Sequence, residues 1–374
     1  MIIGIDGNEA NVGERVGVNV YAFELLWSIW KLRKEWGKKH KLIVYLKRPL
    51  LADMPKGMQN FRYRIIPGGG AWVITKLMPR LFLDKEKPDV FFSPSHYIPP
   101  LAPMPKVCSI MDLGYLESSG QFKKRDYWQL RVWSAISILL SKAIISISQS
   151  TKKDIVRHYP WSSKKVYVTP LAYDKEKINT MVSANDVRRV KNKHTIVGDY
   201  ILFLSTLKPS KNVEGLLDAF GGVRDVFPDI KLVIAGKKGW LFDSIYEKTK
   251  DLGLEKGVIF TGYVAERDKP ALIKGAKAFV LPSYWEGFGL DVLTAMASGV
   301  PVVVSDVGSL PEVVNGAGIM VDPYKTKSIE SGIIKLLSLD NVGYNRYVKA
   351  GLTQVKKFSW ADTARETLKI ITNS

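Results

Sequence analysis

The chain has few cysteine and histidine residues and no long, uncharged apolar run. Cys108 is the single cysteine among 374 residues, which excludes a disulfide framework and a cysteine-based zinc cluster. The four histidines are scattered, with no H-x-x-x-H pair, so we expect no histidine-rich metal site. No stretch reaches the ~18 consecutive apolar residues of a membrane span. Asp6 and Glu9 interrupt the N-terminus where a signal peptide would need an apolar core.

The rest of the composition is typical of a globular protein, but its positive charge lies mostly in one half. Apolar residues make up 46% and charged residues 24%, and a length of 374 residues predicts two domains. Residues 1–200 contain 33 basic and 17 acidic side chains, a net +16, against 22 and 19, a net +3, in the remainder. This asymmetry predicts an anionic partner: membrane headgroups, nucleic acid or an acidic acceptor. Because RNP-like, KH-like and zinc-finger patterns are missing, we expect no nucleic-acid partner.

Short β-branched runs alternate with longer helical patterns, which predicts an α/β protein with parallel sheets covered on both faces. Strands are predicted at 2–5, 41–46, 62–66, 89–92, 106–110, 143–147, 166–169, 200–204, 231–235, 258–261, 278–281 and 301–305. Helices are predicted between them, for example at 18–33, 125–141, 151–159, 213–224, 290–298 and 361–371. The polar, basic and weakly periodic stretch 183–199 is interpreted as a linker between two Rossmann-like halves.

Two glycine-containing segments are candidates for binding a ligand. The loop 7–17, between the first strand and a helix, has glycines that would let backbone N–H groups approach an anion; a plain flexible loop is the alternative. In the segment 282–305, a strand end leads through Gly287 and Gly289 into a helix. Glu286 follows that strand, where open parallel sheets place their ligands, and its carboxylate could accept hydrogen bonds from sugar hydroxyls. A helix-capping glutamate is an equally good interpretation of Glu286.

A family resemblance adds to this interpretation. Residues 286–305 match most of the pattern E-G-F-G-L-P-x-L-E-A-M-A-x-G-x-P-V-V-x-S of one family. Further motifs of the same family occur along the chain: P-S-K-N at 209–212, L-V-I-A-G at 232–236, F-T-G-Y-V at 260–264 and F-S-W at 358–360. The chain thus resembles the retaining glycosyltransferases of family 4, the group 1 glycosyl transferases. The resemblance implies the GT-B fold, two Rossmann-like domains whose parallel sheets face each other across a cleft. We expect an acceptor-side domain of residues 1–182 joined by the C-terminal helix 359–374, and a nucleotide-sugar domain of residues 183–358.

The resemblance also implies roles for individual residues. Glu286 would orient the transferred sugar, and Lys211 would neutralise the leaving diphosphate; these are the two expected catalytic residues. The remaining donor contacts would come from Gly17 of the first domain and from Ser205, Thr206, Lys237, Gly262, Tyr263, Gly287, Phe288, Gly289, Leu290 and Thr294 of the second. The nucleobase would lie near Lys237, Gly262 and Tyr263. Met111 and Asp112 stand at the family's H-D pair on the acceptor side.

Three positions depart from the family pattern. Thr294 replaces the glutamate that usually holds the ribose, so a hydroxyl stands where a charged, bidentate acceptor is expected. Met111 replaces a histidine and cannot donate a hydrogen bond to a sugar. Thr206 replaces an arginine sometimes found there, so Lys211 would neutralise the diphosphate more alone.

The expected reaction is transfer of a sugar from a nucleotide-sugar co-substrate, UDP- or GDP-linked, to a glycan or a lipid-linked acceptor, with retention of configuration. No D-x-D motif occurs, so we expect no metal, and we expect no other cofactor. One alternative is a binding protein that kept the fold but lost turnover, which Thr294 and Met111 favour. A GT-B sugar-nucleotide epimerase is another, against which the E-G-F-G-L match argues.

Three segments of the first half place tryptophan beside lysine or arginine: 18–36, 69–87 and 121–140. Such helices fit a peripheral contact with an anionic membrane surface. The alternative is that their apolar faces cover the first sheet and their cations are solvated. We therefore expect a cytoplasmic protein, peripheral on the inner membrane face if the first interpretation holds.

Overall fold

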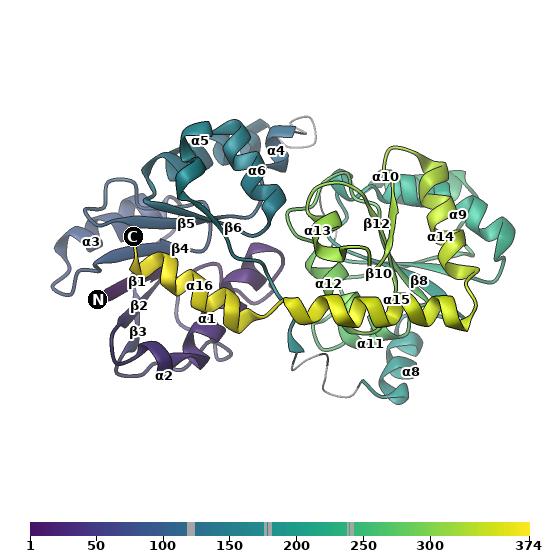
Figure 1. Cartoon of the computed structure of the whole chain (residues 1–374), viewed down its shortest axis with the longest axis horizontal. Helices are drawn as coiled ribbons and strands as arrows, with labels where there is room; N and C mark the ends of the chain where they lie inside the picture. Colours follow the sequence, from purple (N-terminus) through teal and green to yellow (C-terminus); the bar gives the residue numbers. More distant parts are fainter. Residues whose placement is uncertain (118–123, 176–177, 179–181, 238, 240–242) are drawn as a thin grey trace. The chain divides into compact units, whose positions relative to one another are not determined.

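The computed structural model describes residues 1–374 apart from 118–123, 176–177, 179–181, 238 and 240–242. The described residues form two units, Met1–Leu171 with Ser359–Ser374, and Ala172–Phe358. The two units therefore divide between residues 171 and 172, earlier in the chain than the boundary between residues 182 and 183 that the sequence suggested. In each unit a parallel sheet is flanked by helices, as the strand–helix alternation predicted (Figure 1).

The sheet of the first unit has seven strands in the order β3-β2-β1-β4-β5-β6-β7. These strands are β1 (Ile2–Asp6), β2 (Lys41–Leu46), β3 (Phe61–Ile65), β4 (Val90–Ser93), β5 (Lys106–Ile110), β6 (Ala143–Ser146) and β7 (Val166–Val168). All pairings are parallel, and Gly4 of β1 aligns with Ile43 on one side and Phe91 on the other. The strand order reverses between β1 and β4, and the loops that follow these two strands therefore diverge there.

The helices of the first unit come from both ends of the chain. They are α1 (Val18–Lys31), α2 (Arg33–Trp36), α3 (Met78–Leu83), α4 (Gly114–Glu117), α5 (Lys124–Leu140), α6 (Gln149–His158) and α16 (Trp360–Thr372), with the short turns η1 (Val73–Leu77) and η3 (Pro160–Lys165). The last helix, α16, packs along α1, where the rings of Tyr21 and Trp360 lie 6.4 Å apart (Figure 1). Arg365 of α16 also pairs with Glu35 of α2. The C-terminus therefore completes the first unit.

The sheet of the second unit has six strands in the order β10-β9-β8-β11-β12-β13, again all parallel. They are β8 (Tyr200–Leu204), β9 (Lys231–Ala235), β10 (Val258–Gly262), β11 (Ala278–Leu281), β12 (Val302–Ser305) and β13 (Ile319–Val321). The short β13 was not predicted from the sequence. The side chains of β8, β11 and β12 are fully buried, as expected for central strands covered on both faces.

The helices of the second unit are α8 (Ala184–Lys193), α9 (Val213–Val226), α10 (Asp243–Asp251), α11 (Lys269–Lys274), α12 (Leu290–Ala297), α13 (Leu310–Val314), α14 (Thr326–Leu337) and α15 (Asn341–Gln354), with the turns η4 (Pro209–Lys211) and η5 (Val355–Lys357). In the part of the chain that the structure describes, no helix combines the length and apolarity needed to cross a bilayer.

The linker predicted at 183–199 is wrong, because helix α8 occupies most of it. Ser183 and Asp186 form a capping box, each side chain bonding the other's backbone N–H group. Arg189 and Lys193 pair with the fully buried carboxylate of Asp268, at 2.9 and 2.7 Å. The polar residues that suggested a linker therefore attach this helix to its unit.

Candidate functional site

The candidate site lies where the strand order of the second sheet reverses, between β8 and β11. Ligands of open parallel sheets bind at the carboxyl ends of such strands, because the loops there diverge and leave room. The loop after β8 carries Lys211, and the loop after β11 carries Glu286. Two segments 75 residues apart thus bring both expected catalytic side chains to this point.

Lys211 and Glu286 form a nearly buried ion pair. The Lys211 Nζ atom lies 2.5 Å from Glu286 Oε1, and 12% and 10% of the two side chains are exposed. The hydroxyl of Ser283 donates to the same Oε1 atom at 2.9 Å. Within the described residues no hydrogen bond reaches Oε2, so this oxygen is the one available to a hydroxyl of a bound sugar.

Asn212 holds the two loops together. It adopts a left-handed conformation, caps α9 by accepting from the Gly215 N–H group, and is buried. Its amide nitrogen donates to the carbonyls of Pro282 at 3.1 Å and Pro323 at 2.8 Å. This side chain therefore fixes the loop of its neighbour Lys211 against the ends of β11 and β13.

The backbone of Glu286 is held from the other side by the loop after β12. Ser309 donates to the Glu286 carbonyl through both its backbone N–H group, at 3.2 Å, and its hydroxyl, at 3.0 Å. Gly308 has φ +62°, and a Cβ atom there would lie 2.7 Å from the same carbonyl oxygen. Only glycine allows this approach without displacing Glu286.

Helix α12 begins at Leu290, shortly after Glu286, and supplies backbone amides. Its N-cap, Gly289, has φ +89°, and no side chain caps the helix. The N–H groups of the first turn and the positive end of the helix dipole can therefore receive an anion. The segment Gly287–Leu290, which was expected to contact the donor, leads into this helix, and within it Phe288 is buried against Phe358.

Two polar side chains of α12 distinguish this chain from the family pattern. Thr294 donates its hydroxyl to the Leu290 carbonyl at 2.9 Å, so its proton is used within the helix. Asp291 was missed in the sequence interpretation, although it stands at the proline of the E-G-F-G-L-P pattern. Burial raises the pKa of the Asp291 carboxyl to about 6, opposed by the positive charge of Lys269 and reinforced by the negative charge of Glu286.

The other donor residues expected in the second unit, including those expected near the nucleobase, lie at the carboxyl ends of β8, β9 and β10. The Ser205 N–H group donates to Ala235, the Gly236 N–H group to Gly262, and the Leu207 N–H group to Lys237, at 2.9–3.1 Å. These bonds bring the loops of Ser205, Lys237 and Gly262 together. Thr206 is partly exposed and Tyr263 exposed at the same ends.

The remaining predicted residues belong to the first unit. Gly17 has φ +51° and is the N-cap of α1. Met111 and Asp112 follow β5, at the carboxyl edge of that sheet. The Met111 carbonyl accepts from Thr151, and the Asp112 carboxylate accepts from the Gly114 N–H group at 2.9 Å.

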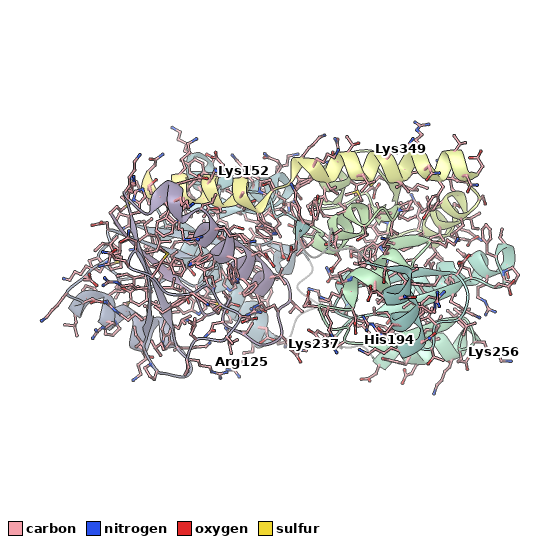
Figure 2. All side chains as sticks on the ribbon, turned by 90° about the horizontal axis from the view of Figure 1, so that it is seen from below. Arg125, Lys152, His194, Lys237, Lys256 and Lys349 are labelled. Atoms are coloured by element: carbon pink, nitrogen blue, oxygen red, sulfur yellow. The ribbon has the colours of Figure 1, made fainter. Side chains whose placement is uncertain are left out.

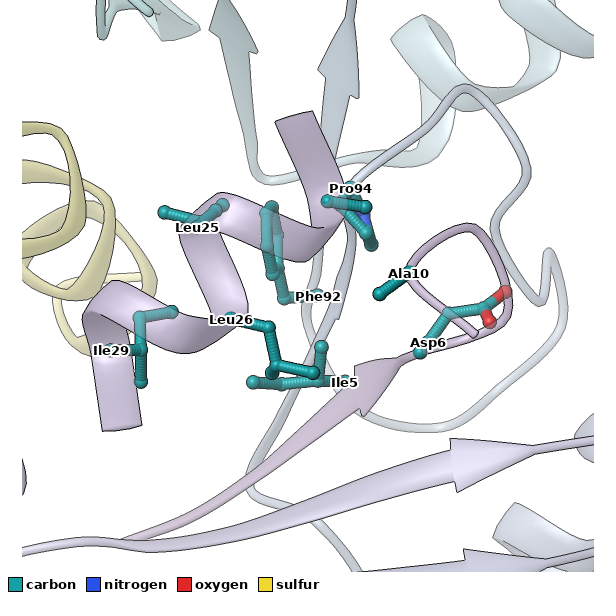
Figure 3. A pocket seen from close by; sticks show the side chains of 10 residues that line it. Ile5, Asp6, Ala10, Leu25, Leu26, Ile29, Phe92 and Pro94 are labelled. Atoms are coloured by element: carbon teal, nitrogen blue, oxygen red, sulfur yellow. The ribbon is translucent and has the colours of Figure 1, made fainter. Parts of the chain in front are cut away.

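The first unit also contains a pocket between the loop after β1 and α1 (Figure 3). Its lining is apolar apart from Asp6, with Ala10, Leu26 and Phe92 among the wall residues. Asp6 accepts from the Asn8 N–H group at 2.9 Å, and burial raises the pKa of its carboxyl to about 6. Because no basic side chain lines it, this pocket does not suit a diphosphate.

Comparison with known proteins identifies the family of this chain. Residues 186–352 match the family model described as Glycosyl transferases group 1. An uncharacterized glycosyltransferase of Methanocaldococcus jannaschii is 30% identical over 283 residues, covering 71% of this chain and 69% of that protein. The O-antigen chain mannosyltransferase B of Escherichia coli is 34% identical over 234 residues, 61% of this chain. The match spans 60% of that relative's length and 28% of a serotype-specific mannosyltransferase of the same organism.

A solved structure matches the whole chain. The Anabaena protein HepE in complex with UDP-glucose superposes with a TM-score of 0.75 at 17% identity, covering 100% of this chain and 99% of that one. This similarity, which covers both units, establishes the GT-B fold. The chain belongs to the group 1 glycosyl transferase family.

Proposed function

We propose that this protein transfers a mannosyl group from a nucleotide sugar to a growing glycan, with retention of configuration and without a metal ion. The observation that carries the proposal is the Lys211–Glu286 ion pair. It lies where the strand order of the second sheet reverses, near the start of α12, which no side chain caps. A cation, a carboxylate and the first backbone amides of α12 are thus found together at one edge of the sheet. A diphosphate can be bound by the cation and the amides, and a sugar by the carboxylate.

In this proposal each group has a separate task. Lys211 and the first amides of α12 stabilise the negative charge that develops on the leaving diphosphate. Glu286 accepts hydrogen bonds from the sugar hydroxyls through Oε2 and so fixes the ring. Ser205, Thr206, Lys237, Gly262 and Tyr263 complete the donor site of the second unit. In the first unit, Gly17 keeps the donor-side role, and Met111 and Asp112 the acceptor-side role, that the family resemblance implies.

In the proposed transfer, one bond breaks and another forms at the anomeric carbon. The bond from this carbon to the phosphate oxygen breaks, and a bond to an acceptor hydroxyl oxygen forms on the same face of the ring. The acceptor's proton moves to the leaving phosphate. This route needs no side-chain nucleophile and no metal ion to compensate the phosphate charge.

Mannose and a glycan acceptor are proposed from the names of the relatives. One acts, by its name, as an O-antigen chain mannosyltransferase and another as a serotype-specific mannosyltransferase. The base of the proposed donor is uracil or guanine. HepE binds UDP-glucose at low identity, which favours neither base here.

A thermal-unfolding screen of GDP-mannose, UDP-mannose, UDP-glucose and their free nucleotides tests the donor. A donor present at 100 times its Kd should add about 2.7 kcal/mol to the free energy of unfolding. Stabilisation by GDP-mannose or UDP-mannose supports the proposal. If neither stabilises the protein while another nucleotide sugar does, mannose is the wrong sugar.

A protein that binds nucleotide sugars but no longer turns them over is the second candidate. Thr294 favours it, because it stands where the family has a glutamate and so the ribose lacks a charged acceptor. Such a protein would be stabilised by the donor and yet release no nucleotide when an acceptor is added.

A further inference from the structure

Helix α5 packs Ile138, with the partly buried Tyr127 and Leu130, against the core of its unit, and it leaves other large apolar side chains exposed. Its fully buried residues are Ser134, Ser137 and Ile138. Large apolar side chains point outward instead: 56% of Trp128, 49% of Val132 and 60% of Leu139 are exposed. A helix that buries serines and exposes tryptophan and leucine presents an apolar surface without a partner in its own unit.

These exposed residues share one side of the helix with a cation. Arg125, Trp128, Val132 and Leu139 are spaced i, i+3, i+7 and i+14, which places them on a single helical face. We call these four residues the α5 face. Arg125 lies at the margin of the unit, on the opposite side from Lys152 (Figure 2).

Further cations and a second tryptophan border the α5 face. The guanidinium of Arg131 lies 5.2 Å from the centre of the Trp128 ring. At the other end, Lys165 donates to the Leu139 carbonyl and lies 4.9 Å from the ring centre of Trp161, which is half exposed. Lys124, Lys142 and Lys164 are exposed beside these residues, and Asp126 is the single acidic residue of α5.

The other two tryptophan-containing segments use their tryptophans internally. In 18–36, Trp27 and Trp30 donate their indole N–H groups to the carbonyls of Asp53 and Lys56, and Trp36 is buried. In 69–87, Trp72 is buried and donates to Ile66. Leu83 is exposed there, but the neighbouring acids Asp84 and Glu86 pair with basic side chains.

We propose that the α5 face docks on the surface of an anionic phospholipid bilayer. Exposed tryptophan and leucine enter the headgroup region, and the surrounding lysines and arginines meet the lipid phosphates. The net charge of +16 in residues 1–200 supplies long-range attraction of the same sign. This goes beyond the proposed transfer reaction, because it assigns a place where the protein works rather than a substrate.

Co-sedimentation of the full chain with vesicles tests the proposal without any nucleotide sugar, so its failure leaves the transferase proposal untouched. We expect binding to vesicles containing phosphatidylglycerol, weak binding to pure phosphatidylcholine, and release by salt. K124E/R125E/K142E should weaken partitioning by at least about 100-fold, since the loss of each cation at an anionic surface costs about fivefold before the added negative charge is counted. Trp128→Ala should weaken it about tenfold through lost apolar burial, also at high salt.

Two control variants carry the same change in charge elsewhere on the unit: K34E/K38E/K39E and K76E/K85E/K87E. Both should retain most of the vesicle binding. A control that loses as much binding as the α5 variant would overturn the assignment of the α5 face. So would wild-type protein that ignores anionic vesicles at low salt but binds an acidic polysaccharide. Unchanged thermal unfolding of each variant establishes that the fold is intact.

Discussion

The ammonium group of Lys211 lies 2.5 Å from Oε1 of Glu286, so the two expected catalytic residues neutralise each other's charge. A bound diphosphate would compete with Glu286 for Lys211. The carboxylate would then be free to turn both oxygens toward the sugar. In the proposed reaction, donor binding would therefore release Glu286 to hold the sugar.

This competition separates the effects of Glu286→Gln and Lys211→Ala. Glu286→Gln should lower kcat by roughly 30- to 1000-fold, about 2–4 kcal/mol, because a preorganised charged group is lost at the reacting sugar. It should leave nucleoside diphosphate affinity unchanged or tighter, since Lys211 loses its internal partner. Lys211→Ala should weaken that affinity by about 10- to 100-fold. Steady-state kinetics and calorimetry measure the two quantities.

Lys256→Ala is the matched control, because Lys256 lies at a distant end of the second unit (Figure 2). It should change neither kcat nor nucleotide affinity. Equal loss of nucleotide affinity in Glu286→Gln and Lys211→Ala would contradict the proposed division of tasks.

Gly308→Ala should displace Glu286 and lower kcat. The new Cβ atom would lie 2.7 Å from the Glu286 carbonyl oxygen and would also force alanine to φ +62°. Gly316→Ala separates the two effects, because Gly316 has φ +79° with no atom near its Cβ position. Both variants should lose about 1–2 kcal/mol of stability from backbone strain. Only Gly308→Ala should lose activity, and equal activity in the two would show that the contact with Glu286 has no catalytic importance.

Thr294→Glu should tighten binding of the free nucleotide by about tenfold, because a carboxylate accepts hydrogen bonds from ribose hydroxyls more strongly than a hydroxyl does. Thr294→Val is the control. Its lost hydroxyl donates to Leu290 within α12, so nucleotide affinity should not change. Calorimetry that finds weaker binding in Thr294→Glu would mean that the ribose lies elsewhere.

Asp291→Asn should stabilise the protein in a pH-dependent way. Burial raises the pKa of Asp291 from 3.8 to about 6, so the ionised carboxylate destabilises the folded state above pH 6. Asparagine removes this cost, which is about 3 kcal/mol at pH 7–8. The advantage should shrink as the pH falls through 6 and vanish near 4, where the carboxyl is protonated in both states. Urea unfolding of both proteins between pH 4 and 8 measures it, and a pH-independent difference would refute the assignment.

The sequence predicted the architecture well, because strand–helix alternation and buried β-branched runs depend on local pattern. The predicted strands at 200–204, 231–235 and 278–281 match β8, β9 and β11. Strand β13 was missed since only three residues separate Gly318 from Asp322. Helix α8 was taken for a linker because its ion partner, Asp268, is 75 residues or more away in the chain, although Ser183 and Asp186 already formed a capping pattern.

Within the candidate site, motifs identified Glu286 and Lys211 but not how they are held. The carbonyls that Asn212 bonds follow other strands, and the approach of Gly308 to Glu286 depends on a backbone conformation. Such contacts arise from the tertiary fold, and no local pattern reports them. Asp291 could have been noticed, since it replaces a proline of the family pattern.

The measurement that tests the central claim most directly is the release of nucleoside diphosphate from GDP-mannose and UDP-mannose, with and without a mannose-terminated oligosaccharide. We expect release that depends on the acceptor, yields an elongated oligosaccharide with the donor's anomeric configuration, and continues in the presence of EDTA. Glu286→Gln should abolish most of it while still binding the nucleotide. Donor binding without acceptor-dependent release, under conditions where the wild-type protein is folded, would contradict the account and favour a binding protein.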